Sequence, residues 1–477
     1  MYENYQNLHP INVNRLDPKL EMSFNTDQYS CYVPGGSVYC AGVFPYLLPI
    51  WYTDWRDETL SWHLTCSFHA HLNPSPITVI RGPEAKKFLA ENFVNNIEKF
   101  PVGISKHGIM CLDNGLIATH GVLLRTDEYE YEAWWHAPFI DYAFSLKKYD
   151  AELVDLTHKR FVFQLQGPYV LQILEEVTGD DLHDIDYRHF RDSSIDGNTV
   201  RILRFGMSGT LGYEIHGDIE YAKELWKKII TIGNPYGIRP LGGLAYGLDH
   251  TAGGFPQIGN SFISAMTTDP GFIKFSTPEK TGGSVSYDES AMVMELTGSA
   301  GTDLARHLFN PFEVGLGHCI NWNHEFRGKS ALQEYAKNRK RGIVTLLWNP
   351  EDLAEVYISQ FRPGEECYKQ MDSPGWETAL SAHFTQNIDL ILNKDGKEIG
   401  LSIGRTQNFY FRAMLSMGSI DREYQELDTE VYILWGEPGA KQMKIRAKVA
   451  PFPYNQHILN TNFDVNTIPK HEKRGNL

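Results

Sequence analysis

Long apolar runs are missing from this chain of 477 residues. A membrane-spanning helix needs about 18 or more consecutive apolar residues, and no stretch of the sequence reaches that length. The N-terminal segment also lacks the charged and then apolar stretches of a secretory signal peptide. We therefore expect a cytoplasmic protein with no membrane partner.

Basic residues are in short supply, because 44 Lys and Arg stand against 59 Asp and Glu and the formal net charge is −15. A protein that binds duplex nucleic acid needs a cationic surface to replace counterions, so we expect no nucleic-acid partner. The six cysteines form no CxxC pair, which argues against a zinc ribbon or a redox motif. We expect reduced, mostly buried cysteines and no bound metal.

Common nucleotide-binding and hydrolase signatures are absent as well. Gly328-Lys329-Ser330 lacks the glycine that a phosphate-binding loop requires five residues earlier, where Asn323 stands. The segment GGLAYG at 242–247 does not match GxGxxG, and no GxSxG elbow occurs. Phosphate-loop, dinucleotide-binding and α/β-hydrolase functions are therefore disfavoured.

A repeated unit is what the chain does contain. The segments ITVIRGP at 77–83 and FVFQLQGP at 161–168 each end an apolar strand pattern in Gly-Pro, and a helical pattern follows each of them. We expect these helices at 84–93 and 169–177, with the proline at the first helical position and Gly179 as the C-terminal cap of the second. A duplicated strand–helix layer predicts an α+β fold.

The pattern changes along the chain. Residues 219–232 and 329–337 predict two more helices, whereas short strand-like runs separated by Gly, Asp or Asn dominate beyond about residue 338. We expect an α+β region at 1–337, in two intertwined subdomains, followed by a β-barrel at 338–460. The polar residues 461–477 are expected to form a loose tail.

Several of these segments resemble one known family. NPFEVGLGHCINWNHEFRGKSAL at 310–332 and RFGMSGTLGYEIHG at 204–217 are similar to motifs of the glycine-cleavage T-protein (aminomethyltransferase) superfamily, as are both Gly-Pro units. WRDETLSW at 55–62 and FQLQGP at 163–168 resemble its tetrahydrofolate-dependent aromatic O-demethylases, which act on vanillate and syringate. The resemblance implies folate-binding α+β domains with ferredoxin-like layers and a C-terminal β-barrel.

The resemblance also implies a tetrahydrofolate site. Glu214 matches the acidic residue that holds the pterin ring, and a carboxylate suits the adjacent N–H donors of that ring. Gln166 and Phe255 match a polar and an aromatic position of the same pocket, and Tyr213 precedes Glu214 in the motif. These four residues are the predicted cofactor-binding set.

A second set is implied for the transfer of a methyl group from a small-molecule donor to the folate. Tyr246 matches a tyrosine that is implicated in proton donation, and a phenol can protonate a departing oxygen. His69 and His71 alternate on a predicted strand and therefore point to one face. They are the further catalytic candidates, with metal ligation and simple packing as the alternatives for this pair.

The donor side departs from the demethylases. Ala70 and His71 replace a family aspartate and glutamine, and His136 replaces an arginine that clamps an aromatic carboxylate. Histidine holds a carboxylate less well than arginine does, so His136, Trp134 and Tyr46 are predicted to bind a different donor.

Three functions stay open at this stage. The first is O-demethylation of a neutral methoxyarene, giving 5-methyltetrahydrofolate and a phenol. The second is demethylation of a sulfonium or quaternary ammonium compound in an aromatic cage. The third is folate binding without catalysis, and the oligomeric state is not predicted.

Overall fold

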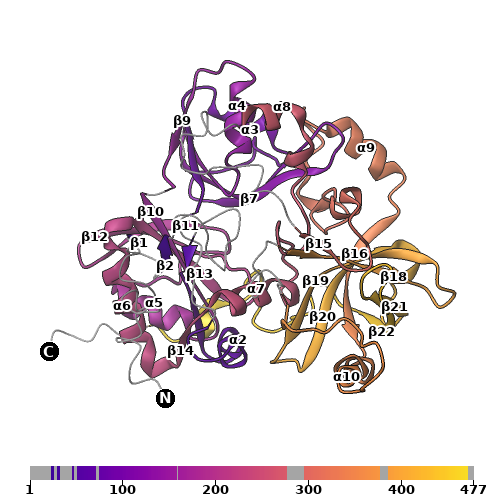
Figure 1. Cartoon of the computed structure of the whole chain (residues 1–477). Coiled ribbons are helices and arrows are strands. Elements are labelled where there is room, and N and C mark those ends of the chain that lie inside the picture. The colour runs from indigo at the N-terminus through magenta and orange to yellow at the C-terminus, as the bar shows by residue number, and fades with distance from the viewer. Residues whose placement is uncertain are drawn as a thin grey trace.

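The computed structural model describes residues 51–70, 75–157, 159–276, 295–375 and 385–470, and the backbone of three short strands nearer the N-terminus. Figure 1 shows three lobes arranged around the middle of the molecule. Two lobes are built on open sheets with helices, and the third is a barrel. No helix in the described ranges is long and apolar enough to cross a membrane.

The first lobe is built on a six-stranded sheet. Its strands, in spatial order, are β11 (Phe190–Ile195), β12 (Asn198–Leu203), β13 (Gly212–Asp218), β10 (Arg160–Gln166), β4 (Cys66–His69) and β14 (Ile238–Pro240). Only the β4–β14 pair is parallel. The helices α5 (Val170–Thr178) and α6 (Ala222–Gly233) pack their apolar faces on one side of this sheet.

The second lobe is built on a five-stranded antiparallel sheet. Its strands, in spatial order, are β6 (Ser105–Cys111), β7 (Ile117–Asp127), β8 (Glu130–Trp134), β5 (Ile77–Arg81) and β9 (Glu152–Asp155). One face packs into an apolar core with α3 (Ala85–Asn92), α4 (Phe139–Ser145) and α8 (Pro270–Phe275). The other face is turned toward the six-stranded sheet, since Ile77 and Trp134 share a core with Val162 and Leu203.

The third lobe is a closed barrel. Its strands follow the order β16 (Arg341–Trp348), β20 (Ala413–Asp421), β19 (Glu398–Asn408), β18 (Asp389–Leu392), β21 (Glu430–Trp435) and β22 (Met443–Ala450). The helices α9 (Lys329–Lys337) and α10 (Pro350–Ser359) precede and follow β16. The remaining strands are short: β1 (Ser23–Asn25), β2 (Ser30–Tyr32), β3 (Tyr46–Leu47), β15 (Glu295–Thr297) and β17 (Thr385–Asn387).

Two helices connect the lobes. The helix α7 (Gly243–Ala252) is buried along its whole length between the six-stranded sheet and the barrel, and Thr251 Oγ1 donates to the Gly404 carbonyl of β19 at 2.7 Å. The helix α2 (Trp55–Leu64) lies beside α7. Its buried Glu58 accepts from the backbone N–H of Gly242, the N-cap of α7, at 2.8 Å. The start of α7 is thereby fixed against α2.

The two Gly-Pro turns confirm the predicted repeat. Gly82 and Gly167 have φ values of +130° and +128°, and an added Cβ would approach backbone atoms at 2.8 Å and 2.6 Å respectively. Only glycine fits both conditions. The helices begin slightly later than expected, because Glu84 and Tyr169, not the prolines, precede the first helical residues. Gly179 caps α5 in the left-handed region at φ +74°, as predicted.

The α+β class and the C-terminal barrel are confirmed. Two helices contradict the expectation: α10, inside the region where only strands were expected, and α8, where loops with short strands were expected. Both begin at a proline that follows a side-chain cap, Asn349 and Asp269 respectively, and such short helices have little periodicity to detect. The helices α2, α4 and α7 were not predicted either.

The polar C-terminal segment differs from the loose tail that was expected. Val465 and Ile468 are buried in the core of the first lobe, and Arg204 donates to the carbonyls of Asn460 and Phe463 at 3.2 and 2.7 Å. The described part of the tail, which ends at residue 470, is therefore a packed segment. Two isolated apolar residues do not form a detectable period, which is why the sequence pattern missed them.

Candidate functional site

Three polar side chains form a row on the six-stranded sheet, on the face opposite the α5–α6 core. Gln164 of β10 is paired in register with Glu214 of β13 on one side and with His69 of β4 on the other. Directly opposed residues on neighbouring strands point to the same face, and all three are buried. The sheet thus brings the predicted Glu214 and His69 together, with Gln164 between them.

The end of this row at Glu214 is rich in hydrogen-bond acceptors. Gln164 Nε2 donates to Glu214 Oε1 at 2.9 Å, and His216 Nε2 lies 2.9 Å from Glu214 Oε2. Burial lowers the pKa of His216 despite the neighbouring carboxylate, so the ring is neutral and its one N–H is used at Nε2. Gln164 Oε1 and His216 Nδ1 are buried and have no hydrogen-bond partner among the described residues.

Trp134 joins this cluster from the facing sheet. Its ring lies against the His216 ring, with centroids 4.6 Å apart, and its Nε1 donates to Glu132 Oε2 at 3.0 Å. Glu132 in turn forms a buried two-pronged ion pair with Arg201 at 2.8 and 3.0 Å. The predicted donor residue Trp134 therefore lies at the Glu214 end of the row and is oriented by an ion pair between the two sheets.

Gln166 is fully engaged within the protein. Its Oε1 accepts from the backbone N–H and the hydroxyl of Ser208, both at 2.7 Å, and its Nε2 donates to Asp249 Oδ2 at 3.4 Å. An added Cβ on Gly206 or Gly212 would meet the same side chain at 2.7 or 3.0 Å. Gln166 thus ties β10 to the loop before β13 and to α7.

Tyr246 of α7 lies at the other end of the row. Its ring is 4.0 Å from the His69 ring and 5.0 Å from the His250 ring, measured between centroids. Gln257 Nε2 donates to the Tyr246 hydroxyl at 2.9 Å, and that hydroxyl donates to the Met207 sulfur at 3.7 Å. Burial raises the pKa of Tyr246 above its ordinary value, so the group is a neutral phenol near pH 7.

The predicted Phe255 forms a third group with His107 and His120, which were not predicted from the sequence. The Phe255 ring is stacked on His107 of β6, with centroids 5.2 Å apart and planes 11° apart, and it lies 5.9 Å from the His250 ring. His107 Nε2 is 2.8 Å from His120 Nδ1. The sequence contains no alternating signal for this pair, because His107 stands between Lys106 and Gly108 and His120 between Thr119 and Gly121.

Two predicted site residues lie on the opposite faces of their sheets from these groups. His136 contacts Thr119 Oγ1 through Nδ1 at 2.8 Å and Phe93 through its ring, and it lies beneath Gly108 on the helix-covered face of the five-stranded sheet. Tyr213 is buried in the α5–α6 core, on the face opposite Glu214. The β-strand period of two explains this outcome, because Tyr213 and Glu214 are adjacent and must point to opposite faces.

His71 lies outside the described residues, and only the backbone of Tyr46 is described, within β3. Ala70, which replaces the family aspartate, is buried against the core of the first lobe. The carboxylates of Asp249 and Glu214 lie near enough to Tyr246 to raise its pKa further.

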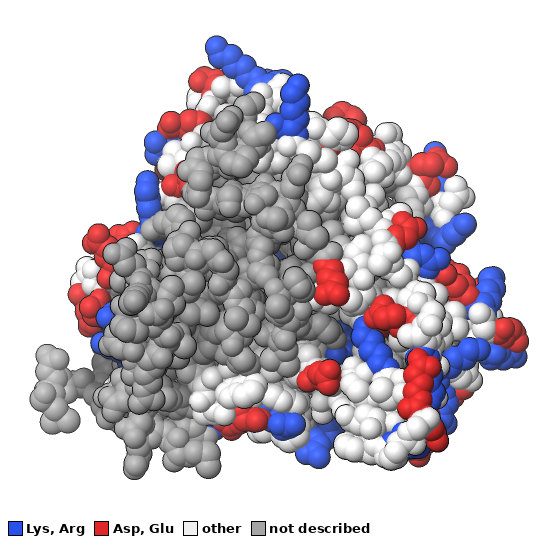
Figure 2. Space-filling model, in the orientation of Figure 1, with Lys and Arg blue, Asp and Glu red and all other residues white. Residues whose placement is uncertain are grey.

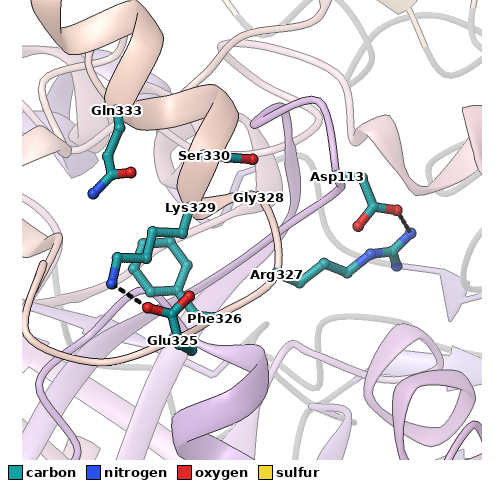
Figure 3. Close-up of a pocket in the computed structure, with 8 residues that line it drawn as sticks. All are labelled: Asp113, Glu325, Phe326, Arg327, Gly328, Lys329, Ser330 and Gln333. Atoms are coloured by element: carbon teal, nitrogen blue, oxygen red, sulfur yellow. Dashed lines mark hydrogen bonds and ion pairs between the residues drawn. The ribbon is translucent and has the colours of Figure 1, made fainter.

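A cavity of about 400 Å³ lies elsewhere, at the start of α9 (Figure 3). Its charged side chains are closed into ion pairs, Lys329 with Glu325 at 2.7 Å and Arg327 with Asp113 at 2.8 Å. Arg327 also pairs with Asp269 at 2.7 Å. Figure 2 shows the same interspersed pattern of acidic and basic residues over the barrel. We assign the site to the residues between the sheets and not to this cavity, because buried acceptors there have no hydrogen-bond partner in the described part of the chain.

One group of described residues has the spacing of a metal site, namely Glu175, Asp181 and His183. His183 Nδ1 contacts the two carboxylates at 2.8 and 3.0 Å, and its Nε2 donates to the Ile468 carbonyl at 3.0 Å. Both ring nitrogens are thus occupied in holding the C-terminal segment, and the group has a structural use that needs no ion.

Comparison with known proteins agrees with this architecture. The family model described as the GCVT N-terminal domain matches residues 43–269. The sesamin methylene transferase of Sinomonas sp. (strain No.22) is 35% identical over 429 residues, which are 89% of this chain and 94% of that protein. The syringate O-demethylase of Sphingobium sp. (strain NBRC 103272 / SYK-6) is 27% identical over 435 residues, covering 86% and 90% of the two chains.

A solved structure supports the fold. The glycine cleavage system aminomethyltransferase T from Bartonella henselae superimposes with a TM-score of 0.60 at 16% identity, over 88% of this chain and 95% of that one. The resemblance found in the motifs is thereby confirmed over nearly the whole chain. The chain belongs to the glycine-cleavage T-protein (aminomethyltransferase) superfamily and lies near its O-demethylases.

Proposed function

We propose that this protein is a tetrahydrofolate-dependent transferase that removes a one-carbon group from an uncharged aryl ether, in the first place the methyl group of a methoxyarene. The observation that carries the proposal is the pairing of two sites on one sheet row. Buried acceptors surround Glu214 at one end, and a neutral phenol, Tyr246, lies against His69 at the other.

The acceptor end suits a pterin. The 2-amino group and N3–H of a pterin ring are adjacent donors, and Glu214, Gln164 Oε1 and His216 Nδ1 offer acceptors on one face of the sheet. An unpaired buried acceptor costs about 1–3 kcal/mol, so a donor-rich ligand edge would recover free energy that the protein alone forgoes. Tetrahydrofolate would supply the nucleophilic nitrogen that receives the carbon atom.

The phenol end suits a leaving oxygen. When the methyl carbon moves to nitrogen, the carbon–oxygen bond breaks and the aryl oxygen gains negative charge. Tyr246 can donate its hydroxyl proton to that oxygen, because its present acceptor is a thioether sulfur, which accepts weakly. The proton released from the receiving nitrogen balances the proton that the aryl oxygen takes up, so the overall transfer needs no oxidant or reductant.

The surroundings of Tyr246 favour an uncharged donor. Its described contacts are His69, Met207, His250 and Gln257, and none of these is a lysine or an arginine. A benzoate donor such as syringate calls for a guanidinium that binds its carboxylate in two places. A neutral methoxyphenol needs only hydrogen bonds and aromatic contact.

A second donor chemistry is favoured by the sequence comparison. The sesamin methylene transferase is more similar to this chain than the syringate O-demethylase, at 35% against 27% identity. An aryl methylenedioxy group would release two phenolic oxygens and give a methylene-bridged folate, where a methoxy group gives 5-methyltetrahydrofolate. The two products differ in mass and are separable.

The experiment is a transfer assay with purified protein and tetrahydrofolate. The donors are methoxyphenols, methoxybenzoates, a methylenedioxybenzene, a betaine and a dimethylsulfonium compound, and the folate product is identified by mass spectrometry. We expect 5-methyltetrahydrofolate from the uncharged methoxyphenols. Transfer from only the betaine or the sulfonium compound would refute the aryl-ether donor, and folate binding without any transfer would favour a non-catalytic protein.

A further inference from the structure

The pair His107–His120 is held in one tautomeric arrangement by its contacts. The backbone N–H of Ile258 donates to His120 Nε2 at 3.1 Å, so this nitrogen carries no proton when the ring is neutral. Burial lowers the pKa of His120 well below its ordinary value, and the nearby histidines lower it further. His120 is therefore neutral, and its single N–H is at Nδ1.

The tautomer of His120 determines the tautomer of His107. His120 Nδ1 lies 2.8 Å from His107 Nε2, so the first is the donor and the second the acceptor. Burial lowers the pKa of His107 to about 4, with a smaller contribution from His318. His107 is then neutral near pH 7 and carries its N–H at Nδ1, on a side chain that is partly exposed while His120 is buried.

The sheet directs His107 toward the site. His107 is paired in register with Val122, and Val122 with Trp134, so the three side chains lie in one row on one face. Trp134 in that row packs on His216, the partner of Glu214. Phe255, which stacks on His107, also lies beside His250 and thus beside Tyr246.

One short segment orients both hydrogen-bond donors. Gln257 fixes the Tyr246 hydroxyl and its neighbour Ile258 fixes His120. The series of hydrogen bonds from His107 through His120 ends at the backbone N–H of Ile258, which cannot give up its proton. His107 can therefore donate a hydrogen bond but cannot act as a net proton source, in contrast to Tyr246.

We propose that His107, oriented by His120, is a specificity-determining residue that donates an Nδ1–H hydrogen bond to an oxygen of the aryl-ether donor. The inference rests on the proposed function and names how the site selects its substrate. The neutral Nδ1–H of His107 can donate to an ether or phenol oxygen. Unlike a guanidinium, it provides no positive charge to bind a carboxylate. His120 acts through His107 and is a positioning residue.

The test compares four variants with the wild type. His107→Leu and His120→Leu remove the hydrogen bonds, whereas His107→Asn and His120→Asn keep an amide N–H near the position of Nδ1. His318→Leu is the matched control, because His318 is a nearby exposed imidazole. Each variant is first shown to unfold cooperatively and to bind tetrahydrofolate as the wild type does.

For His107→Leu we expect the KM of a methoxyphenol and the Kd of its demethylated product to rise about 10- to 100-fold, as loss of one hydrogen bond in a buried site predicts. His107→Asn should recover most of that loss and His120→Leu should show a smaller rise, while kcat changes less than KM. Unchanged KM and Kd in His107→Leu, or equal losses in His107→Leu and His107→Asn, would overturn the proposal.

A second measurement does not depend on turnover. Nitrogen-15 NMR of histidine-labelled protein distinguishes protonated from unprotonated ring nitrogens, and we expect the proton at Nδ1 in both His107 and His120. A proton at His107 Nε2 would overturn the proposal even if the enzyme transfers methyl groups. If no aryl ether is a donor but the product phenol still binds through His107, the proposed function fails while the recognition by His107 stands.

Discussion

The strand–glycine–proline–helix unit occurs twice in this chain, as β5–α3 and as β10–α5, and the two copies share a backbone but bury different side chains. Gly82 and Gly167 have nearly the same φ, and both are enclosed by backbone atoms. Three residues before the glycine, however, the first copy has Val79 and the second has Gln164. Both side chains are buried on the inner face of their sheet.

This difference indicates which of the two buried side chains has a use beyond packing. Val79 is apolar and buried. Gln164 donates to Glu214 and buries an acceptor that has no hydrogen-bond partner among the described residues. A buried strand position gains stability from an apolar residue, so a glutamine there is retained at a cost. Gln164 therefore stabilises the fold less than an apolar side chain would at the same position. Such a loss of stability is common at functional sites, and we propose that the ligand binds here.

The largest expected effect is on kcat and concerns Tyr246, which lies beside the sheet of the second copy. Tyr246→Phe removes the hydroxyl that we propose as the proton donor and keeps the ring packing against His69. We expect kcat to fall about 100- to 10,000-fold, the usual contribution of general acid catalysis, with little change in KM or in tetrahydrofolate affinity. Steady-state kinetics with a methoxyphenol test this, and a loss in KM alone would assign Tyr246 to binding.

The shared backbone predicts equal sensitivity of the two turns. Gly82→Ala and Gly167→Ala each force a Cβ into backbone atoms at a positive φ, and each should destabilise the protein by about 2–4 kcal/mol. Gly179→Ala is the matched control, because its φ is +74° but nothing lies within 4 Å of the added Cβ. Urea denaturation measures the free energy of unfolding of all three variants. If Gly179→Ala lost as much stability as the turn variants, the positive φ and not the contact of the added Cβ would be the cause.

The buried Glu132 of the first copy's sheet is paired with Arg201, whereas the partner of Glu214 among the described ion pairs is His216. Glu214→Gln should weaken tetrahydrofolate binding roughly 10- to 100-fold, the value of charged hydrogen bonds, and should leave unfolding cooperative. Isothermal calorimetry provides the Kd. Unchanged affinity would remove Glu214 from the folate site.

A reciprocal exchange sharpens the comparison directly. Gln164→Val copies the first unit into the second, and we expect the free energy of unfolding to change by less than about 1 kcal/mol while folate affinity falls about 10-fold. Val79→Gln makes the opposite change and should cost about 1–3 kcal/mol of stability with no change in affinity. If both variants affect only stability, the two positions are equivalent and Gln164 has no function in binding.

The sequence predicted some parts of this comparison and missed others for physical reasons. The two turns, α5, α9 and the barrel were visible because glycine, proline and apolar periods report local structure. Glu214 was reached through a family motif and His69 through its alternation with His71 on a predicted strand. Gln164, which lies between them, was passed over because the pairing of β10 with β4 and β13 is set by the tertiary structure. The faces that His136 and Tyr213 occupy were not predicted, since ungapped counting and adjacency ignore which face of a strand a residue occupies.

The smallest expected effect lies in the helices of the two units. The buried residues of α3 are apolar, whereas α5 buries Glu175, which holds His183 and, through it, the carbonyl of Ile468. Burial lowers the pKa of His183, but the hydrogen bond to Ile468 and the Glu175 carboxylate outweigh it, and the net pKa is raised.

A raised folded pKa means that the contribution of His183 to stability is fully present below the unfolded pKa of about 6.5 and is lost as the pH rises through the folded value. We therefore expect His183→Gln to lower the free energy of unfolding by roughly 1 kcal/mol near pH 6 and by less near pH 9. Urea denaturation of both proteins at the two pH values tests this. A loss that grew toward pH 9 would mean that the neutral ring, and not the charged one, holds the C-terminal segment.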